Sequence, residues 1–126
     1  MIVVDASAVV EAMSGDEQTR SLLVENNIAA PHLLDTEVIH VIRKHLQRRA
    51  ISLRVANEAV SFLHAFEIER VATVALNDAI WGMRANLTSY DATYVALAQH
   101  LDVPLLTGDR RMAKAARRYC QTIVSD

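Results

Sequence analysis

Short apolar segments alternate along the chain with longer amphipathic segments. Runs rich in apolar and β-branched residues predict strands at Ile2–Val4, Ile28–Pro31, Arg70–Val74, Val103–Thr107 and Thr122–Val124. Apolar residues at helical spacing predict helices over residues 6–13, 16–27, 33–49, 52–66, 77–86, 88–100 and 110–119. Strands that alternate with helices are typical of a parallel sheet with helices on both faces. The sequence therefore predicts an α/β fold.

The composition is that of one globular domain over residues 1–126, with 52% hydrophobic and 22% charged residues. The single cysteine, Cys120, excludes an internal disulfide and a cysteine-based zinc site, and it fits a reducing cytoplasm. No apolar run approaches the ~18 residues of a membrane span, and the first residues lack the basic start of a signal peptide. The net charge of −2 provides no overall attraction to nucleic acid, so such a partner would need local basic patches.

Four acidic residues occupy related positions in this pattern. Asp5 and Asp109 each follow a predicted apolar strand, and the carboxyl ends of parallel strands share one edge of a sheet. Asp91 lies in the first turn of a predicted helix, and Glu37 lies beside the apolar stripe of another. Each acid has a local explanation when it is considered alone. These explanations are helix capping, the helix dipole, or a position at the edge of the apolar stripe. These local explanations account less well for all four together, so we expect one shared site.

A shared site of several carboxylates restricts the chemistry. Close carboxylates repel one another unless a cation or a proton compensates their charge. Hard oxygen ligands suit Mg²⁺ or Mn²⁺ and do not suit zinc. Such a site activates a water molecule and stabilises the charge on a phosphate under in-line attack. Glu37 and His40 also form an E-x-x-H pair, but a di-iron site needs a second pair that the sequence does not contain.

Basic residues cluster in two places. One group follows Asp109 and contains Arg110, Arg111, Lys114, Arg117 and Arg118; the other contains Arg43, Lys44, Arg48, Arg49 and Arg54. Either group could contact phosphates, and either could be an ordinary solvated helix face. The first group is the better candidate because it begins beside an acid of the expected site. Few aromatic residues accompany either group, so extensive base stacking is not expected.

The remaining aromatic, histidine and cysteine residues receive structural interpretations. We expect core or interface roles for Phe62, Phe66, Trp81, Tyr90 and Tyr94. The side chains without metal-ligand spacing or an acid–base partner are interpreted as structural: His32, His64, His100 and Cys120.

Four motifs together resemble a known family. They are V-V-D-A-S-A from Val3, P-H-L-L-D-T-E-V-I-H-V-I-R from Pro31, S-Y-D-A-T-Y-V-A-L-A from Ser89 and L-L-T-G-D-R-R-M from Leu105. In this order and spacing they are similar to the PIN-domain ribonucleases, and among these most similar to the VapC toxins of bacterial toxin–antitoxin pairs. The resemblance covers nearly the whole chain, although residues 52–86 add little to it.

The resemblance implies a three-layer α/β/α sandwich and a Mg²⁺-dependent endoribonuclease, with Mn²⁺ as a possible substitute. It implies Asp5, Glu37, Asp91 and Asp109 as the catalytic acids. Within this site we expect Asp5, Asp91 and Asp109 to hold the metal. Ser7 and Thr107 match small hydroxyl positions that support this site, and Gly108 is at a position that we expect to vary.

The resemblance also implies partners. It predicts a homodimer, an RNA substrate and a VapB-like antitoxin that covers the acidic cleft. Two other interpretations stay open: a catalytically silent PIN-like binding module, and a receiver-like signalling domain that binds Mg²⁺. The receiver-like interpretation is the weaker one, because the first strand ends in D-A-S without an acid pair and no phosphoacceptor acid follows a middle strand.

Overall fold

The computed structural model describes residues 1–125, so Asp126, the last residue of the expected domain, lies outside it. Five strands form one sheet in the order β3-β2-β1-β4-β5. Their bounds are β1 Ile2–Val4, β2 Ile28–Pro31, β3 Glu69–Val71, β4 Leu105–Thr107 and β5 Thr122–Val124. All four neighbouring strand pairs are parallel. The predicted α/β architecture with a parallel sheet is therefore confirmed.

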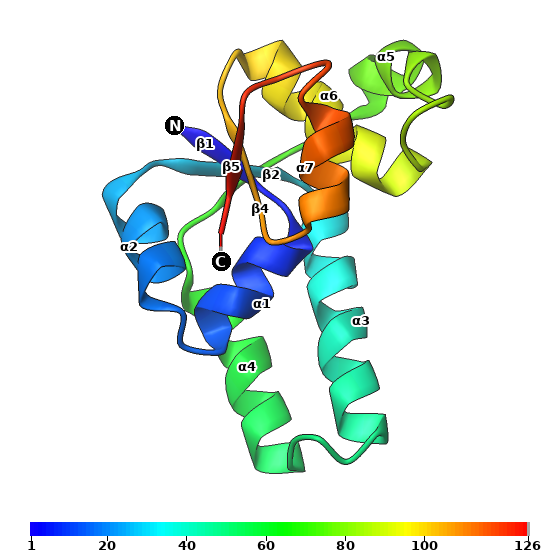
Figure 1. Ribbon diagram of the computed structural model, residues 1–126. Coiled ribbons are helices and arrows are strands. Elements are labelled where there is room, and N and C mark those ends of the chain that lie inside the picture. Colours follow the sequence, from blue (N-terminus) through cyan, green and yellow to red (C-terminus); the bar gives the residue numbers. More distant parts are fainter. Residues whose placement is uncertain (126) are drawn as a thin grey trace.

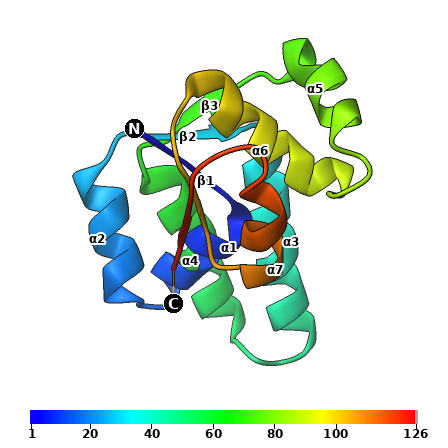
Figure 2. The same ribbon diagram turned by 45° about the horizontal axis from the view of Figure 1, so that its top comes forward.

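Helices cover both faces of the sheet. They are α1 Ala6–Met13, α2 Glu17–Glu25, α3 Leu33–Gln47, α4 Leu53–Ala65, α5 Asn77–Gly82, α6 Ser89–Leu101 and α7 Arg110–Ala116, with a short 3-10 turn, η1, at Val74–Leu76. Figures 1 and 2 show α1 to α4 on one side of the sheet and α5 to α7 on the other. Right-handed crossovers produce this division, because the chain runs from β1 to β3 in one direction and from β4 to β5 in the other. No helix in residues 1–125 is both long and apolar enough to cross a membrane.

The central strand is the one that precedes Asp5. Val3 pairs with Ala29 of β2 on one side and with Leu105 of β4 on the other. Ile2, Val3 and Val4 are buried, as expected for a strand covered on both faces. The start of the chain is therefore fixed in the middle of the sheet, and the residue after β1 has a defined position.

Two predicted strands are longer than the observed ones, for identifiable reasons. The expected strand Arg70–Val74 is β3, which ends at Val71 because its partner β2 ends at Pro31, the residue that pairs with Val71. The expected strand Val103–Thr107 begins only at Leu105, because Pro104 has no N–H to donate to a neighbouring strand.

Helices α3 and α6 end in the same way. Arg49 and Asp102 both have a positive φ, of 58° and 54°. The N–H of the next residue then bonds back to the last turn, from Ala50 to His45 and from Val103 to Ala98, each pair with an N···O distance of 2.9–3.0 Å. This left-handed turn ends α3 at Gln47, two residues before the predicted end.

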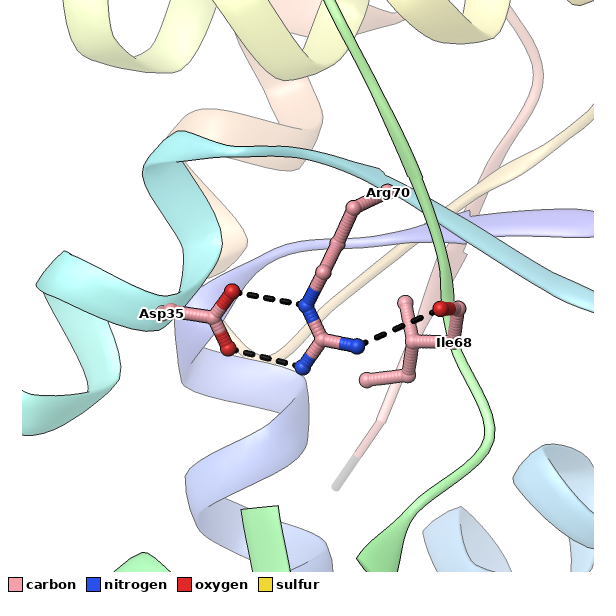
Figure 3. A network of polar contacts seen from close by, with 3 residues as sticks. All are labelled: Asp35, Ile68 and Arg70. Carbon is pink, nitrogen blue, oxygen red and sulfur yellow. Dashed lines mark hydrogen bonds and ion pairs between the residues drawn. The ribbon is translucent and has the colours of Figure 1, made fainter. Parts of the chain in front are cut away.

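An ion pair fixes the first turn of α3 against the edge strand β3. Figure 3 shows the Arg70 guanidinium facing the Asp35 carboxylate, with two N···O distances of 2.7 Å. The same guanidinium donates to the backbone oxygen of Ile68 at 3.2 Å. The hydrogen bond from Arg70 is the largest cause of the lowered pKa of Asp35. Because Asp35 is two residues before Glu37, this pair also helps to place the start of α3 next to the sheet.

Replacing Arg70 by Gln is expected to lower the free energy of unfolding at pH 7 by ~1–2 kcal/mol, since it breaks a two-bonded ion pair that is only partly solvated. The pKa of Asp35 is lower in the folded protein than its ordinary value of 3.8, so the ion pair stabilises the fold at pH values above 3.8. This contribution to the free energy of unfolding is lost as the pH falls through the native pKa. Urea unfolding at pH 7 and pH 3 measures both effects. The control is Arg54→Gln, because the pair of Arg54 with Glu58 is highly exposed and should contribute little. An equal decrease in the free energy of unfolding in both variants would contradict the prediction.

Candidate active site

The candidate site lies at the carboxyl edge of the sheet, where β1 and β4 are neighbours. The connections from these two strands run in opposite directions, and ligands of open α/β sheets bind at such a switch point. Asp5 follows β1, and Asp109 lies two residues after β4. Helix α3 starts directly after β2, and α6 runs back across the sheet towards β4, so their first turns face the same edge. Figures 1 and 2 show the starts of α3 and α7 close to the junction of β1 and α1.

Asp5 is buried, with 6% of its surface exposed, and its carboxylate accepts three hydrogen bonds. The Ser7 hydroxyl and the backbone N–H of Ala8 donate to Oδ1 at 2.7 and 3.0 Å. The Thr107 hydroxyl donates to Oδ2. Burial nevertheless raises the pKa of Asp5 to about 6, with a further contribution from the charge of Asp91. Asp5 therefore caps α1, as the local explanation required, and is also a carboxylate held in an unfavourable electrostatic environment.

Asp91 connects the four acids electrostatically. It is half-buried in the first turn of α6, where its backbone N–H donates to the Thr88 hydroxyl. Burial is the main cause of its raised pKa, and the charges of Asp109 and Glu37 raise it further. Since Asp91 in turn raises the pKa of Asp5, each of the four predicted acids lies within electrostatic reach of another. The structure brings them to one edge of the sheet, as the sequence predicted.

The loop after β4 is tied to the loop after β1 by hydroxyl groups. The Ser7 Oγ and Thr107 Oγ1 atoms are 3.2 Å apart. The N–H groups of Gly108 and Asp109 donate to the hydroxyls of Ser7 and Thr107 at 2.8 and 3.0 Å. The Asp109 carboxylate caps α7 through the N–H of Arg111, at 2.9 Å, and that of Met112. Ser7 and Thr107 thus hold the two acid-bearing loops together.

Glu37 has a partner that the sequence interpretation assigned to the core. Glu37 is half-buried on α3, and its Oε1 accepts a hydrogen bond of 2.5 Å from the hydroxyl of Tyr94 on α6. The ring of Tyr94 is buried, as expected, with 1% of the residue exposed. Burial, followed by the contact with Glu37 and the charges of Asp5 and Asp91, raises the pKa of Tyr94. The spacing of three residues between Asp91 and Tyr94, which puts both on one face of α6, is the signal that could have identified this residue.

A second unpredicted residue is Glu11, which lies one helical turn after Ser7 on α1. Its carboxylate accepts a hydrogen bond from the buried hydroxyl of Ser125 and packs against Gly108. A Cβ atom at Gly108 would lie 2.6 Å from Glu11 Cδ, well inside contact distance. A side chain at Gly108 would therefore push the Glu11 carboxylate away from Ser125, and the expectation that Gly108 occupies a variable position stays a prediction.

The acidic side chains do not form a complete coordination site for a metal ion. Within residues 1–125, no three acidic, histidine or cysteine side chains are close enough together to hold a cation as they stand. The donors are nevertheless carboxylate oxygens whose mutual repulsion a cation would relieve. Mg²⁺ commonly uses one or two carboxylates and keeps several water molecules, so this donor set fits it.

The two basic groups differ in their position relative to the acids. Arg110, Arg111 and Lys114 are exposed on α7, directly after Asp109. Helix α7 ends at Ala116, three residues before the predicted end, so Arg117 and Arg118 lie after it. The Arg118 guanidinium donates to Asn86 at 3.3 Å. The second group lies along the later turns of α3 and the start of α4, at the far end of the hairpin that projects from the body in Figure 1. The α7 group is therefore the one beside the acids.

The expected core role fails for two aromatic residues. Trp81 and Tyr90 are 66% and 63% exposed, so only the interface interpretation remains for them. Arg84 stacks on the Trp81 ring, with its Cζ atom 4.6 Å from the ring centre. Phe62 and Phe66 are half-buried and pack on each other with ring centres 5.5 Å apart. His32, His64 and His100 are all exposed.

Comparisons with known proteins agree with this architecture. The family model described as PIN domain matches residues 2–118. Ribonuclease VapC1 of Mycobacterium tuberculosis is 44% identical, with 94% of this chain and 93% of the relative covered. Ribonuclease VapC9 of the same organism is 37% identical, with 98% of both chains covered. The crystal structure of PAE2754 from Pyrobaculum aerophilum superposes with a TM-score of 0.72 at 19% identity, over 96% of this chain and 82% of that one.

Proposed function

Because the chain belongs to the PIN-domain family, and within it to the VapC ribonucleases, we propose that the protein is a Mg²⁺-dependent endoribonuclease and the toxin of a toxin–antitoxin pair. The observation that supports this proposal most is the convergence of Asp5, Glu37, Asp91 and Asp109 at the β1–β4 edge. Local capping explains the position of Asp5 and Asp109, but it does not explain why the charges of Asp109 and Glu37 raise the pKa of Asp91, or why the charge of Asp91 raises that of Asp5. Such a cluster is costly for a fold unless it binds a cation.

In this proposal Asp5, Asp91 and Asp109 hold Mg²⁺, directly or through water, and Mn²⁺ can replace it. The ion supplies Lewis-acid stabilisation of the phosphate and lowers the pKa of a bound water molecule. Glu37 orients or deprotonates the attacking water. Ser7 and Thr107 fix the Asp5 carboxylate and the loop that carries Asp109.

The basic residues after Asp109 are proposed to bind the RNA backbone. Arg110, Arg111 and Lys114 are exposed beside the acids, and Arg117 and Arg118 follow the end of α7. Contacts of this kind neutralise phosphates and place the strand without reading its sequence. They also offset the repulsion that an acidic site and a net charge of −2 exert on RNA.

Two protein partners belong to the proposal. A VapB-like antitoxin would cover the acidic cleft, and a basic side chain entering the cleft would be electrostatically favourable. A homodimer is supported by the exposed apolar side chains around α5, where Val74 is 80% and Trp81 66% exposed. The free thiol of Cys120 fits a cytoplasmic location.

Removal of divalent ions is expected to abolish RNA cleavage by the purified, partner-free protein. Total cellular RNA is incubated with the protein in Mg²⁺, in excess EDTA, and in EDTA followed by an excess of Mg²⁺ or Mn²⁺. Cleavage in the first and third conditions and none in the second supports the proposal, and the fragment ends then report the cleavage site. The absence of cleavage with any divalent ion, in a protein that is folded by circular dichroism, would favour the silent binding module. Cleavage that persists in EDTA would contradict a metal-dependent site.

A further inference from the structure

Tyr94 contacts Glu37, an acid of the site that neither follows a strand nor caps a helix. Glu37 is in the second turn of α3, and its side chain is long enough to take several rotamers. The 2.5 Å hydrogen bond from Tyr94 to Oε1 restricts that freedom, and it leaves the other oxygen, Oε2, outside the bond.

The donor is itself held in place. Tyr94 is the largest of the fully buried side chains, and its helix packs against β1 and β2 in the middle of the sheet. A buried aromatic ring with two side-chain torsions has little freedom, so its hydroxyl occupies a nearly fixed point. A hydroxyl that served only to fill the core would be unfavourable there, because a phenylalanine fills the same volume without a polar atom to satisfy.

The contact also joins two elements that carry different acids. Tyr94 lies three residues after Asp91 on α6, whereas Glu37 belongs to α3. These helices lie on opposite sides of the sheet and meet at its carboxyl edge (Figure 1). The hydrogen bond therefore fixes the position of Glu37 relative to Asp91 across the site, which the packing of either helix alone does not do.

We propose that Tyr94 is a positioning residue that holds the Glu37 carboxylate in one orientation at the acidic site through its hydroxyl. This inference rests on the proposed ribonuclease function for its effect on catalysis. Groups that orient the reacting carboxylates of metal-dependent sites typically contribute ~10–100-fold to activity. The hydroxyl does not reach the RNA in this role, so its loss slows the chemical step and leaves substrate binding unchanged.

The test is Tyr94→Phe, with Tyr90→Phe as the matched control. Both changes remove one hydroxyl from the same helix, but Tyr90 is exposed and Tyr94 is bound to Glu37. Two readouts are needed: kcat and KM for a short RNA substrate in Mg²⁺, and crystal structures of both variants and the wild type. We expect kcat of Tyr94→Phe to fall ~10–100-fold with KM within about twofold. We expect the Glu37 carboxylate to be displaced or spread over several positions only in Tyr94→Phe.

The readouts separate failure of this inference from failure of the proposed function. An unchanged kcat in a folded Tyr94→Phe protein overturns the inference, and so does a rise in KM alone. A wild-type protein that cleaves no RNA refutes the proposed function; the structures then decide the positioning role without any activity. An unmoved Glu37 in Tyr94→Phe overturns that role.

Discussion

Replacing Asp91 by Asn is expected to lower the rate of RNA cleavage by ~10³-fold while the protein stays folded. The amide has the same size as the carboxylate but carries no charge, so it is a much weaker ligand for a hard cation. The backbone cap of α6 survives, because the Thr88 hydroxyl accepts from the N–H of residue 91 and not from its side chain. The change also removes a negative charge that raises the pKa of Asp5, and the loss of this repulsion favours folding.

The matched control is Asp102→Asn, at the opposite end of the same helix. Asp102 is exposed and has a left-handed backbone, a conformation that Asn accepts well. Rates are measured on one RNA substrate in Mg²⁺, with circular dichroism and a melting curve for each protein. Asp102→Asn should cleave within about twofold of the wild type. Full activity of a folded Asp91→Asn protein would remove Asp91 from the site.

Replacing Asp5 by Asn is expected to abolish activity and to stabilise the protein at neutral pH. Because burial raises the native pKa of Asp5 from 3.8 to about 6, the folded state binds more protons than the unfolded state between these values. Linkage then makes the free energy of unfolding fall as the pH rises through this interval, by up to ~3 kcal/mol. Asn cannot ionise, so the variant avoids this loss. Its amide oxygen can still accept from the N–H of Ala8 and cap α1.

The measurement is the difference in unfolding free energy between Asp5→Asn and the wild type, from urea titrations in EDTA at several pH values from 4 to 7. We expect the difference to grow in favour of the variant from pH 4 to pH 6 and then to level off. Mg²⁺ should reduce it, because a cation compensates the charge of ionised Asp5. The same series on Asp102→Asn shows what the loss of one exposed negative charge contributes. A difference that does not depend on pH would contradict the raised pKa.

The sequence predicts the acids of the site because each follows from a rule about neighbouring residues. Asp5 and Asp109 come one and two residues after apolar strands, and parallel strands put their carboxyl ends at one edge. Asp91 starts the helix that leads back into the sheet, and Glu37 lies near the start of the helix that leaves β2. Strand and helix periodicity thus indicates that the four acids lie near one another, and their role in catalysis stays a prediction.

The contacts that complete the site are not predictable in this way. Glu11 reaches Ser125 and Gly108, and Tyr94 reaches Glu37, across 57 to 114 positions of sequence. Such contacts depend on how the helices pack on the sheet, and local patterns in the sequence do not predict that packing. The end of β3 escaped prediction for a related reason, because a strand ends where its neighbour can no longer pair with it. The late start of β4, in contrast, follows from Pro104, which is visible in the sequence.

The pairing of β1 with both β2 and β4 also has a consequence for the order of events during protein synthesis. Val3 can pair with Ala29 early, but Leu105, its other neighbour, is translated about a hundred residues later. Thr107 and Asp109 follow at once, so the Thr107 hydroxyl that donates to Asp5 and the last of the four acids leave the ribosome about a hundred residues after Asp5 itself. A nascent chain therefore lacks the assembled acidic site until β4 has been made, and the ribosome that makes the protein is not exposed to that site before β4 can pair with β1.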